Sequence, residues 1–475
     1  MDTKLEQQVD AYVDEVWEDV ATDIAALVSH PSVVDYDAAE QDAPFGHSVR
    51  DALDCALGIA ARLGYEVSDD EGYVGMADIV GECAEQVATI AHVDVVPAGP
   101  GWASDPFAME RREGWLLGRG VIDDKGPAVL SLYAGAYFLK HGITPRYSFR
   151  ALLGCDEEAS MIDVHHYLAG HDDPAFLFTP DAEFPVCNAE KGSFEATFKS
   201  AEVVGGTILS WSGAEASNAI PSESICELAV DATELPVPAA HADRIKITAV
   251  APGCARVFAH GIGGHASLPA GTLNAVGLVV TYLQQVVAER ADLFVSAERS
   301  FLDLLSILHA DTDGTASGIA SENEAFGALT CNAGCIAVCD GRIEQTIDVR
   351  YPDSTSLETM TAVLEPLAAA HGATLEVDHA KPAFSTSAES PAVQTLINTY
   401  NEVTGKQAKP FSMGGGTYAR NFARAVSFGP EEPGLELPEW GGPMHGPNEC
   451  ANESQLKQAL KIYILALLCL QDVDL

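Results

Sequence analysis

The sequence predicts an α/β protein in which a discontinuous domain, built on a mostly parallel central sheet flanked by helices, carries an inserted α+β domain. Three observations lead to this prediction. Helical and strand patterns alternate in the first third, strands of alternating polarity dominate from about residue 187, and the α/β pattern returns after Lys381. We therefore assign residues 1–186 and 381–475 to the first domain and residues 187–380 to the insertion.

In the first third, apolar residues recur at helical spacing over residues 4–28 and 49–64. The apolar segment VATIAHV fits a buried strand, and Gly126-Pro127 then opens a helix with proline at its first position. Strand and helix continue to alternate, which predicts parallel pairing with helices on both faces of the sheet. These later elements are a strand at 147–154, a helix at 161–171 and a strand at 175–178.

In the insertion, the segments GSFEATFKS, RIKITAV and DGRIEQTIDVRY alternate between apolar and polar residues, as half-buried strands do. A helix fits residues 274–289. After the insertion, the longest helical pattern covers residues 453–470.

The composition limits the partners and the compartment. The chain has 26 Lys and Arg residues against 70 Asp and Glu residues, a formal net charge of −44. This surplus argues against nucleic-acid and anionic-membrane partners, because both need basic surface. We find no signal-peptide pattern at the start, and the longest strongly apolar stretch, residues 462–470, is shorter than the about 20 residues that span a bilayer. Eleven scattered cysteines, an odd number, fit a reducing cytosol, so a cytoplasmic protein is expected.

Three of these cysteines, Cys331, Cys335 and Cys339, form a C-x3-C-x3-C run. One interpretation is a metal or cluster site. The other is a set of small core side chains, because even spacing keeps all three on one face of a strand. The spacing differs from the usual C-x2-C of zinc and iron–sulfur sites, which favours the second interpretation.

Acidic and histidine side chains stand where the predicted strands of the first domain end. His92 and Asp94 close the first strand, and residues two apart on an extended chain point to the same side. The carboxyl ends of parallel strands are where sites form in open α/β sheets, so a metal site is one interpretation. Solvated loop acids in an acidic chain are the other, and the residues alone leave both open. The remaining candidates are Asp123, Asp124, Asp156, Glu157, Glu158, Asp181 and His445.

The chemistry of such a set is definite. A carboxylate that bridges two divalent cations holds them about 3.5–4 Å apart despite their repulsion. Histidine and carboxylate ligands together suit zinc. A further carboxylate outside the ligand shell can take a proton from water.

Longer ordered motifs resemble the M20 metallopeptidases, specifically their PepV-type dipeptidase branch. The resemblance rests first on HVDVVPAGPGWASDPFAMERREGWLLGRGVIDDKGP and GCDEEASMIDVHHYLAGHDDPAFLFTPDAEFPVCNAEKG. It continues through SNAIP, GIGGHASLPAGTLNA, DVRYP, MGGGTYAR and GPMHGPNE, and covers nearly the whole chain. Ala159-Ser160 departs from the hydroxyl-bearing or small residue followed by glycine that relatives often have there, which affects only the local loop.

The resemblance implies a ligand set for two zinc ions per chain. Asp123 would bridge the ions, His92 and Asp181 would complete one site, and Glu158 and His445 would complete the other. Manganese or cobalt could substitute for zinc, because ligand type alone discriminates poorly between these metals.

The resemblance also implies roles beside the metals. Glu157 would act as the general base and later as the proton donor to the leaving amine. Asp94 would hydrogen-bond His92 and fix its tautomer. The peptide bond between Asp123 and Asp124 would be cis.

The insertion would be a lid domain that contacts the substrate. His265 resembles the lid histidine that helps to bind the carbonyl oxygen in the transition state. Asn218 and Arg350 resemble substrate contacts, and the planar guanidinium of Arg350 suits a carboxylate. Gly414, Gly415, Gly416 and Thr417 resemble the loop that meets the substrate backbone. In the PepV branch an extra lid subdomain replaces a partner's lid, which favours a monomer with His265 acting in cis and leaves a homodimer open.

The leading hypothesis is a binuclear zinc dipeptidase that hydrolyses dipeptides with a free N-terminus, by metal-activated water with Glu157 as general base. The alternatives are an N-acyl-amino-acid amidohydrolase of the same family and a non-catalytic binding protein on this scaffold. A cysteine-nucleophile hydrolase using Cys155 or Cys187 has little support, because no Cys–His pairing is evident. The side-chain preference, among β-alanyl, D- and L-dipeptides, stays open.

Overall fold

The computed structural model describes residues 3–475. Contacts divide the chain into two compact units. Unit 1 comprises the residues up to 188 together with Ser385–Phe411 and Gly416–Leu475, and unit 2 comprises Ala189–Phe384 and Ser412–Gly415. The domain limits proposed from the sequence, at residues 186 and 380, stay predictions.

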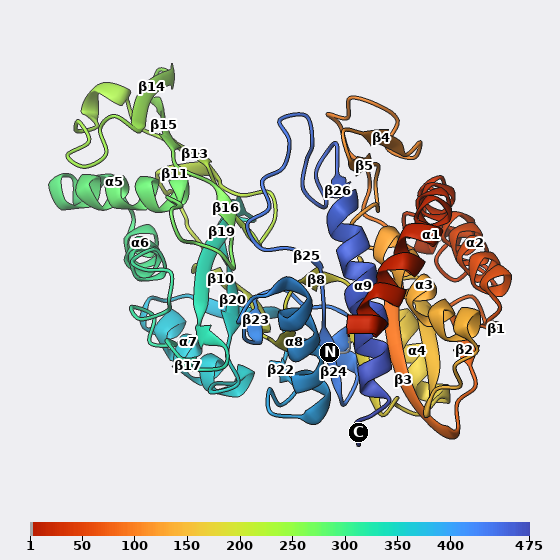
Figure 1. The fold of residues 1–475 in the computed structure, drawn as a ribbon. Coiled ribbons are helices and arrows are strands. Elements are labelled where there is room, and N and C mark those ends of the chain that lie inside the picture. The colour runs from red at the N-terminus through yellow and green to blue at the C-terminus, as the bar shows by residue number, and fades with distance from the viewer. Residues whose placement is uncertain (1–2) are drawn as a thin grey trace. The chain divides into compact units, whose positions relative to one another are not determined.

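Unit 1 is an α/β structure (Figure 1). Its longer elements alternate between helix and strand over residues 125–179, as the sequence predicts, whereas two helices and then three strands of five or more residues come before them. The helices are α1 (Thr3–Val28), α2 (His47–Leu63), α3 (Lys125–His141), α4 (Ile162–Gly170), α8 (Pro391–Thr404) and α9 (Glu453–Leu470). The strands are β1 (Glu66–Asp70), β2 (Val74–Ile79), β3 (Cys83–His92), β4 (Glu110–Arg112), β5 (Trp115–Leu117), β6 (Tyr147–Gly154), β7 (Phe176–Thr179), β8 (Ala182–Glu183), β24 (Ala425–Ser427), β25 (Pro430–Glu431) and β26 (Cys450–Asn452). Three further strands have residues in both units, namely β9 (Cys187–Glu190), β22 (Phe384–Ser385) and β23 (Phe411–Met413).

The central sheet brings the ends of distant strands together. Within residues 3–475 it has nine strands in the order β1-β2-β6-β3-β7-β24-β9-β22, with β23 paired to β9. The four strands β6, β3, β7 and β24 run parallel, while β1 and β2 are antiparallel at one edge. His92 at the end of β3 lies opposite Gly154 at the end of β6, so the residues that follow these strands emerge as neighbours. The predicted fold class is confirmed.

Helix α3 shows how local sequence sets an element and its burial. It begins at Lys125, two residues before Pro127, so the proline lies inside the first turn and not at the first position as predicted. A proline is tolerated there because the first amide groups of a helix have no partner in the preceding turn. Gly142 ends the helix at a φ of 63°, a left-handed conformation that glycine adopts without steric cost.

The core of unit 1 forms where the long helices cover the sheet. Residues 125–138 of α3 are all buried, and α3 packs against α9, α1 and β3. Helix α1 contributes an apolar stripe at helical spacing that includes Val9, Val13, Val20 and Ile24. Helix α3 is thus the element that packs on β3, and α1 and α9 pack against α3.

Unit 2 is an α+β structure with its own core, as the patterns of the insertion predict. Two antiparallel sheets have the orders β19-β20-β10-β21 and β11-β13-β15-β14. The helices are α5 (Ala275–Glu289), α6 (Ser296–Leu308) and α7 (Leu357–Ala370). The strands are β10 (Gly192–Lys199), β11 (Ile208–Ser212), β12 (Ala219–Ile220), β13 (Glu223–Leu228), β14 (Ile245–Ala251), β15 (Cys254–His260), β16 (Gly264–His265), β17 (Glu322–Asn323), β18 (Gly327–Ala328), β19 (Thr330–Cys339), β20 (Arg342–Tyr351) and β21 (Thr374–Lys381).

The three evenly spaced cysteines lie on β19 but do not share one face, so that expectation was wrong. A β-bulge between Ala333 and Ile336 adds a residue relative to β20 and reverses the alternation. Cys331 is consequently buried, whereas Cys339 is exposed. In residues 3–475, no cluster of candidate metal ligands includes any of these cysteines.

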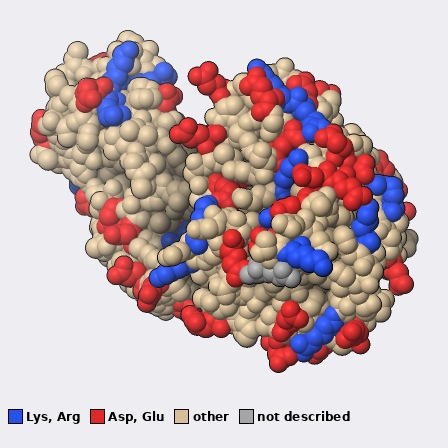
Figure 2. All heavy atoms as spheres, viewed as in Figure 1, with Lys and Arg blue, Asp and Glu red and all other residues tan. Residues whose placement is uncertain are grey.

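Acidic side chains are numerous on the visible face of the molecule. Figure 2 shows Asp and Glu side chains scattered over this face, with Lys and Arg side chains between them. Of the helices in the described part of the chain, none has the length and apolarity that crossing a membrane requires.

Two helical glycines give a matched test of the packing of α3. A Cβ atom at Gly135 would collide with the ring of Phe149 and the hydroxyl of Tyr65, whereas one at Gly58 of α2 meets no described atom within 4 Å. We expect Gly135→Ala to lower the free energy of unfolding by about 1–3 kcal/mol through overpacking. Gly58→Ala should raise it by roughly 0.5–1 kcal/mol through helix propensity. Urea unfolding measures both, and an unchanged Gly135→Ala midpoint would contradict the packing described here.

Candidate metal centre

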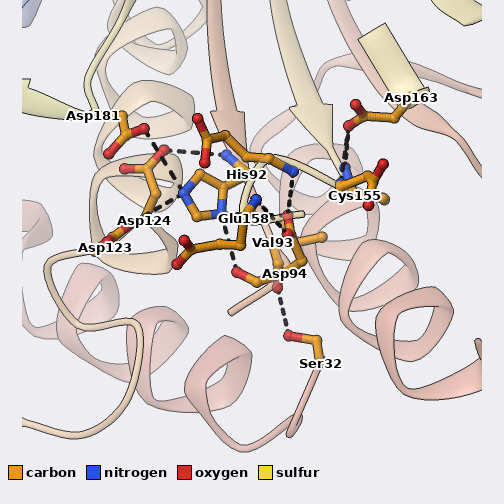
Figure 3. A network of polar contacts seen from close by, with 12 residues as sticks. Ser32, His92, Val93, Asp94, Asp123, Asp124, Cys155, Glu158, Asp163 and Asp181 are labelled. Atoms are coloured by element: carbon orange, nitrogen blue, oxygen red, sulfur yellow. Dashed lines mark hydrogen bonds and ion pairs between the residues drawn. The ribbon is translucent and has the colours of Figure 1, made fainter. Parts of the chain in front are cut away.

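Three of the predicted ligands end or follow strands of the central sheet, and Figure 3 shows His92, Asp123, Glu158 and Asp181 close to one another. His92 is the last residue of β3, and Glu158 lies in the loop that follows β6. Asp181 follows β7, and Asp123 lies two residues before α3. His445 lies in the loop before β26, at a φ of 61°. All five residues belong to unit 1.

The five side chains form two groups that share Asp123. In the first group, His92 Nε2 lies 3.0 Å from Asp123 Oδ1 and 3.9 Å from Asp181 Oδ2. In the second, His445 Nε2 lies 2.8 Å from Asp123 Oδ2 and 3.1 Å from Glu158 Oε2. The ligand atoms within each group lie within 4.8 Å of one another. Each carboxylate oxygen of Asp123 therefore faces a different histidine.

The three carboxylates of the two groups lie close together in a site where a positive charge would stabilise them. Burial, followed by the charge of Asp123, raises the pKa of Asp181 to about 7. Hydrogen bonds to Asp123 and Glu158 raise the pKa of His445 to about 10. In residues 3–475, no lysine or arginine pairs with the carboxylates of Asp123, Glu158 or Asp181. Two histidines and three such carboxylates are the mixed nitrogen and oxygen donor set that divalent metal ions take, so the residues fit metal ions.

Asp94 contacts both His92 and the loop after β6, which carries Glu157 and Glu158. His92 Nδ1 lies 3.0 Å from the carbonyl oxygen of Asp94 and 3.4 Å from its carboxylate, so the backbone is the nearer partner. The carboxylate of Asp94 accepts the N–H of Glu157 at 3.3 Å and that of Glu158 at 3.1 Å. The sequence suggested only the contact with His92. Asp94 in fact ties the end of β3 to the loop after β6.

Asp124 binds the backbone of His92. Its Oδ2 atom accepts the backbone N–H of His92 at 3.1 Å, and its side chain is fully buried. The peptide bond between Asp123 and Asp124 is cis, as the family resemblance implies.

Glu157 precedes the predicted ligand Glu158 in the chain and belongs to neither of the two groups. Burial, followed by the nearby charge of Asp181, raises the pKa of Glu157 well above its usual value. Its position directly beside the ligand loop suits a group that exchanges protons at the site.

Two residues that the sequence did not single out hold the loop after β6. Asp163 Oδ2 accepts the N–H of Cys155 at 2.6 Å and that of Asp156 at 3.1 Å, and the hydroxyl of Tyr418 donates to the same oxygen. Gly154 is required beside this bond, because a Cβ there would collide with the Tyr418 hydroxyl. Both Asp163 and Tyr418 are fully buried. Neither could be found from the sequence, since an acid in the first turn of a helix is ordinarily a surface residue.

In unit 2, contacts connect the residues predicted to meet the substrate. His265 Nδ1 lies 2.7 Å from Ser267 Oγ, and Ala266 N donates to the carbonyl oxygen of Asn218 at 2.8 Å. Arg350 Nη1 lies 3.5 Å from the carbonyl oxygen of Gly414, which itself packs against Ser267. These four predicted residues of unit 2, namely Asn218, His265, Arg350 and Gly414, are thus linked to one another within that unit.

The predicted glycine-rich loop is divided between the units. Gly415 belongs to unit 2, whereas Gly416 and Thr417 belong to unit 1. The side chain of Thr417 accepts the N–H of Ala419 at 3.2 Å and pairs with Ser427 at 3.0 Å. Thr417 thus caps the short helix Tyr418–Asn421, which carries the tyrosine described above.

A parallel sheet that gathers two histidines and three carboxylates at its strand ends defines a metal-dependent enzyme of the α/β class. The model of Peptidase family M20/M25/M40 matches residues 88–468. The chain belongs to this family and is accordingly a metallopeptidase, a hydrolase whose family uses divalent metal ions. The resemblance to the M20 family found in the sequence is confirmed.

Curated relatives and solved structures agree with this assignment. The Beta-Ala-Xaa dipeptidase of Lactobacillus delbrueckii subsp. lactis is 30% identical over 465 residues, which cover 94% of this chain and 95% of the relative. Human carnosine dipeptidase 1 matches with a TM-score of 0.56 at 14% identity, over 99% of both chains. Aminoacylhistidine dipeptidase from Vibrio alginolyticus matches with a TM-score of 0.57 at 17% identity, over 94% of this chain and 95% of that one. At these identities the structures show a shared fold.

The bond between Tyr418 and Asp163 can be tested with a matched pair of variants. Tyr418→Phe leaves the buried carboxylate of Asp163 with one donor fewer, so the free energy of unfolding should fall by about 1–3 kcal/mol. Tyr463 is equally buried, but its hydroxyl has no hydrogen-bond partner among the described residues. Tyr463→Phe should therefore stay within about 1 kcal/mol of the wild type. Equal losses for the two variants in urea unfolding would contradict this account.

Proposed function

We propose that this chain is a binuclear zinc dipeptidase of the PepV-type branch, acting on dipeptides with a free amino terminus. The observation that carries the proposal is the pair of ligand groups that share Asp123, with Glu157 beside them. The similarity to a Beta-Ala-Xaa dipeptidase along nearly the whole of both chains supports the substrate class. Manganese or cobalt could replace zinc in the same ligand set.

Five residues would hold the metals in this proposal: His92 and Asp181 at one ion, Glu158 and His445 at the other, and Asp123 at both. When bound, the ions lower the pKa of water toward neutrality and polarise the peptide carbonyl.

Glu157 would act as the acid–base group. Its carboxylate would accept a proton from the attacking water and give it to the nitrogen of the leaving amine as the C–N bond breaks. The pKa of Glu157 is raised by burial, followed by the charge of Asp181, and a raised pKa makes a carboxyl a better proton acceptor. Asp94 would fix the position of Glu157 by accepting its backbone N–H.

His265 would donate a hydrogen bond to the carbonyl oxygen of the scissile bond. The N–H of Ser267 donates to His265 Nδ1 at 3.2 Å, which makes Nδ1 the acceptor and places the proton of the neutral ring on Nε2. Burial, followed by the charge of Arg350, lowers the pKa of His265 and so keeps the ring neutral. A neutral ring with a proton on Nε2 is suited to stabilise charge that develops on an oxygen.

Arg350 would bind the C-terminal carboxylate of the substrate. Asp348 already engages two of its nitrogens, at 2.9 Å from Nε and 2.6 Å from Nη2, and this holds the guanidinium plane in place. Nη1 makes only a 3.5 Å contact with the carbonyl oxygen of Gly414, so it is the nitrogen best able to donate hydrogen bonds to a substrate carboxylate. Asn218, Gly415, Gly416 and Thr417 would contact the substrate backbone. We further propose that the chain acts as a monomer with its own lid.

The acid–base role of Glu157 predicts a specific pattern in a Glu157→Gln variant. We expect kcat for a dipeptide to fall by about 10²–10⁴-fold, because a positioned proton-transfer group typically contributes that much. The zinc content should remain that of the wild type, since Glu157 is not assigned as a ligand. Metal analysis beside steady-state kinetics measures both quantities. Glu365→Gln, at an exposed position in α7, is the control and should behave as the wild type. Full activity in Glu157→Gln would disprove the mechanism.

The second test distinguishes a dipeptidase from an N-acyl-amino-acid amidohydrolase, which would share the metals. A dipeptide with a free amine should be hydrolysed with a higher kcat/KM than its N-acetylated form. Hydrolysis is followed by the release of the C-terminal amino acid, which both substrates have in common. Preference for the acetylated substrate would reverse the assignment. Bound zinc with hydrolysis of neither substrate would favour a binding protein.

A further inference from the structure

A buried ion pair connects the segments that carry two of the predicted ligands. Arg119 and Glu449 are 1% and 0% exposed, and Arg119 Nη1 lies 2.5 Å from Glu449 Oε2. Arg119 precedes Asp123 in the loop between β5 and α3, and Glu449 follows His445 in the loop before β26. Both residues belong to unit 1. Removing two charges from water costs several kcal/mol per ion, so a pair this deeply buried needs further partners to be tolerated.

Glu449 supplies such partners along the backbone that leads to Asp123. Its Oε1 atom accepts the N–H of Gly120 at 3.0 Å, that of Ile122 at 3.1 Å and that of Asp123 at 3.4 Å. The backbone carbonyl of Glu449 accepts the N–H of Gly118 at 3.1 Å. The carboxylate of Glu449 thus accepts hydrogen bonds from three backbone amide groups and fixes the backbone of the segment that ends at Asp123.

Arg119 reaches the other ligand loop. Its Nη2 atom donates to the carbonyl oxygen of His445 at 3.2 Å and to that of Pro97 at 3.4 Å. The guanidinium lies 5.3 Å from the ring of Trp102, which limits its movement. Arg119 therefore holds the backbone of His445, and Glu449 holds the backbone of Asp123.

We propose that the Arg119–Glu449 pair is a positioning unit that sets the geometry between Asp123 and His445, and so determines the metal affinity of the group formed by Asp123, Glu158 and His445. This inference rests on the proposed binuclear site. Arg119 holds the backbone of His445, which belongs to one group only, whereas its contact with the segment after β3 is to Pro97, beyond His92 and Asp94. When an acceptor for the Asp123 amide is kept, loss of Arg119 should therefore weaken the group that contains His445 more than the group formed by His92, Asp123 and Asp181. Residues that orient ligands typically change metal affinity by about 10–100-fold when mutated.

The test uses the double variant Arg119→Met/Glu449→Gln in the full chain. Glutamine keeps an oxygen for the three amide groups, whereas methionine removes the bond to His445 without leaving a buried charge unpaired. Zinc affinity is measured by titration against a competing chelator, with His445→Ala identifying which of two binding steps belongs to the His445 group. We expect that step to weaken about 10–100-fold and the other by less than about threefold.

The control is Arg112→Met, which removes an exposed arginine that also lies over a tryptophan ring, 4.5 Å from Trp440. It should bind zinc as the wild type does. Wild-type affinities in the double variant would overturn the inference while leaving the proposed function intact. Equal weakening of both steps, in parallel with a lower melting temperature, would also overturn it, since that is the result of general destabilisation. A wild-type chain that binds no zinc would overturn the proposed function and the inference with it.

Discussion

The carboxylate of Asp123 is the constraint on which the rest of unit 1 depends. Its two oxygens face two different histidines, His92 and His445, so a single side chain must satisfy two groups at once. This is possible only if its backbone is fixed from several sides. The amide contact with Glu449 and the start of α3 provide that fixation. The long buried helix α3 anchors the segment, because its first fourteen residues pack into the core.

The sheet and the ligands are two aspects of one arrangement. Parallel pairing of β6, β3 and β7 places their carboxyl ends at one edge, and each loop that leaves this edge carries an acid or a histidine. Buried carboxylates also hold the backbone of these loops in place through hydrogen bonds. Asp94 accepts amide groups from the loop after β6, and Asp163 accepts two more from the same loop. The ligands are therefore oriented by buried acceptors that do not bind metal in our proposal.

The sequence predicted what depends on local pattern and on long motifs. Strand and helix alternation gave the fold class, and ordered motifs gave the family and the five residues that the structure brings together. The sequence-based predictions were wrong or incomplete where the position of a residue depends on strand register or on contacts between distant parts of the chain. The β-bulge at Ala333 moved Cys335 and Cys339 away from the core, and no spacing rule anticipates an inserted residue. The start of α3 was misplaced by two residues, because proline is acceptable at more than one position in a first turn.

The residues that escaped prediction share one physical character: they are charged or hydroxylated, buried, and paired with a side chain distant in sequence. Arg119 and Glu449 are separated by 330 positions, and Tyr418 and Asp163 by 255. In a chain with 70 acidic residues, composition cannot distinguish a buried acid from a solvated one. A buried charge pair is weak evidence for stability, since apolar side chains can often replace it without loss. Its place between the loops that carry Asp123 and His445 is better explained by the geometry it imposes, because apolar packing sets distances loosely whereas directed hydrogen bonds fix both distance and angle.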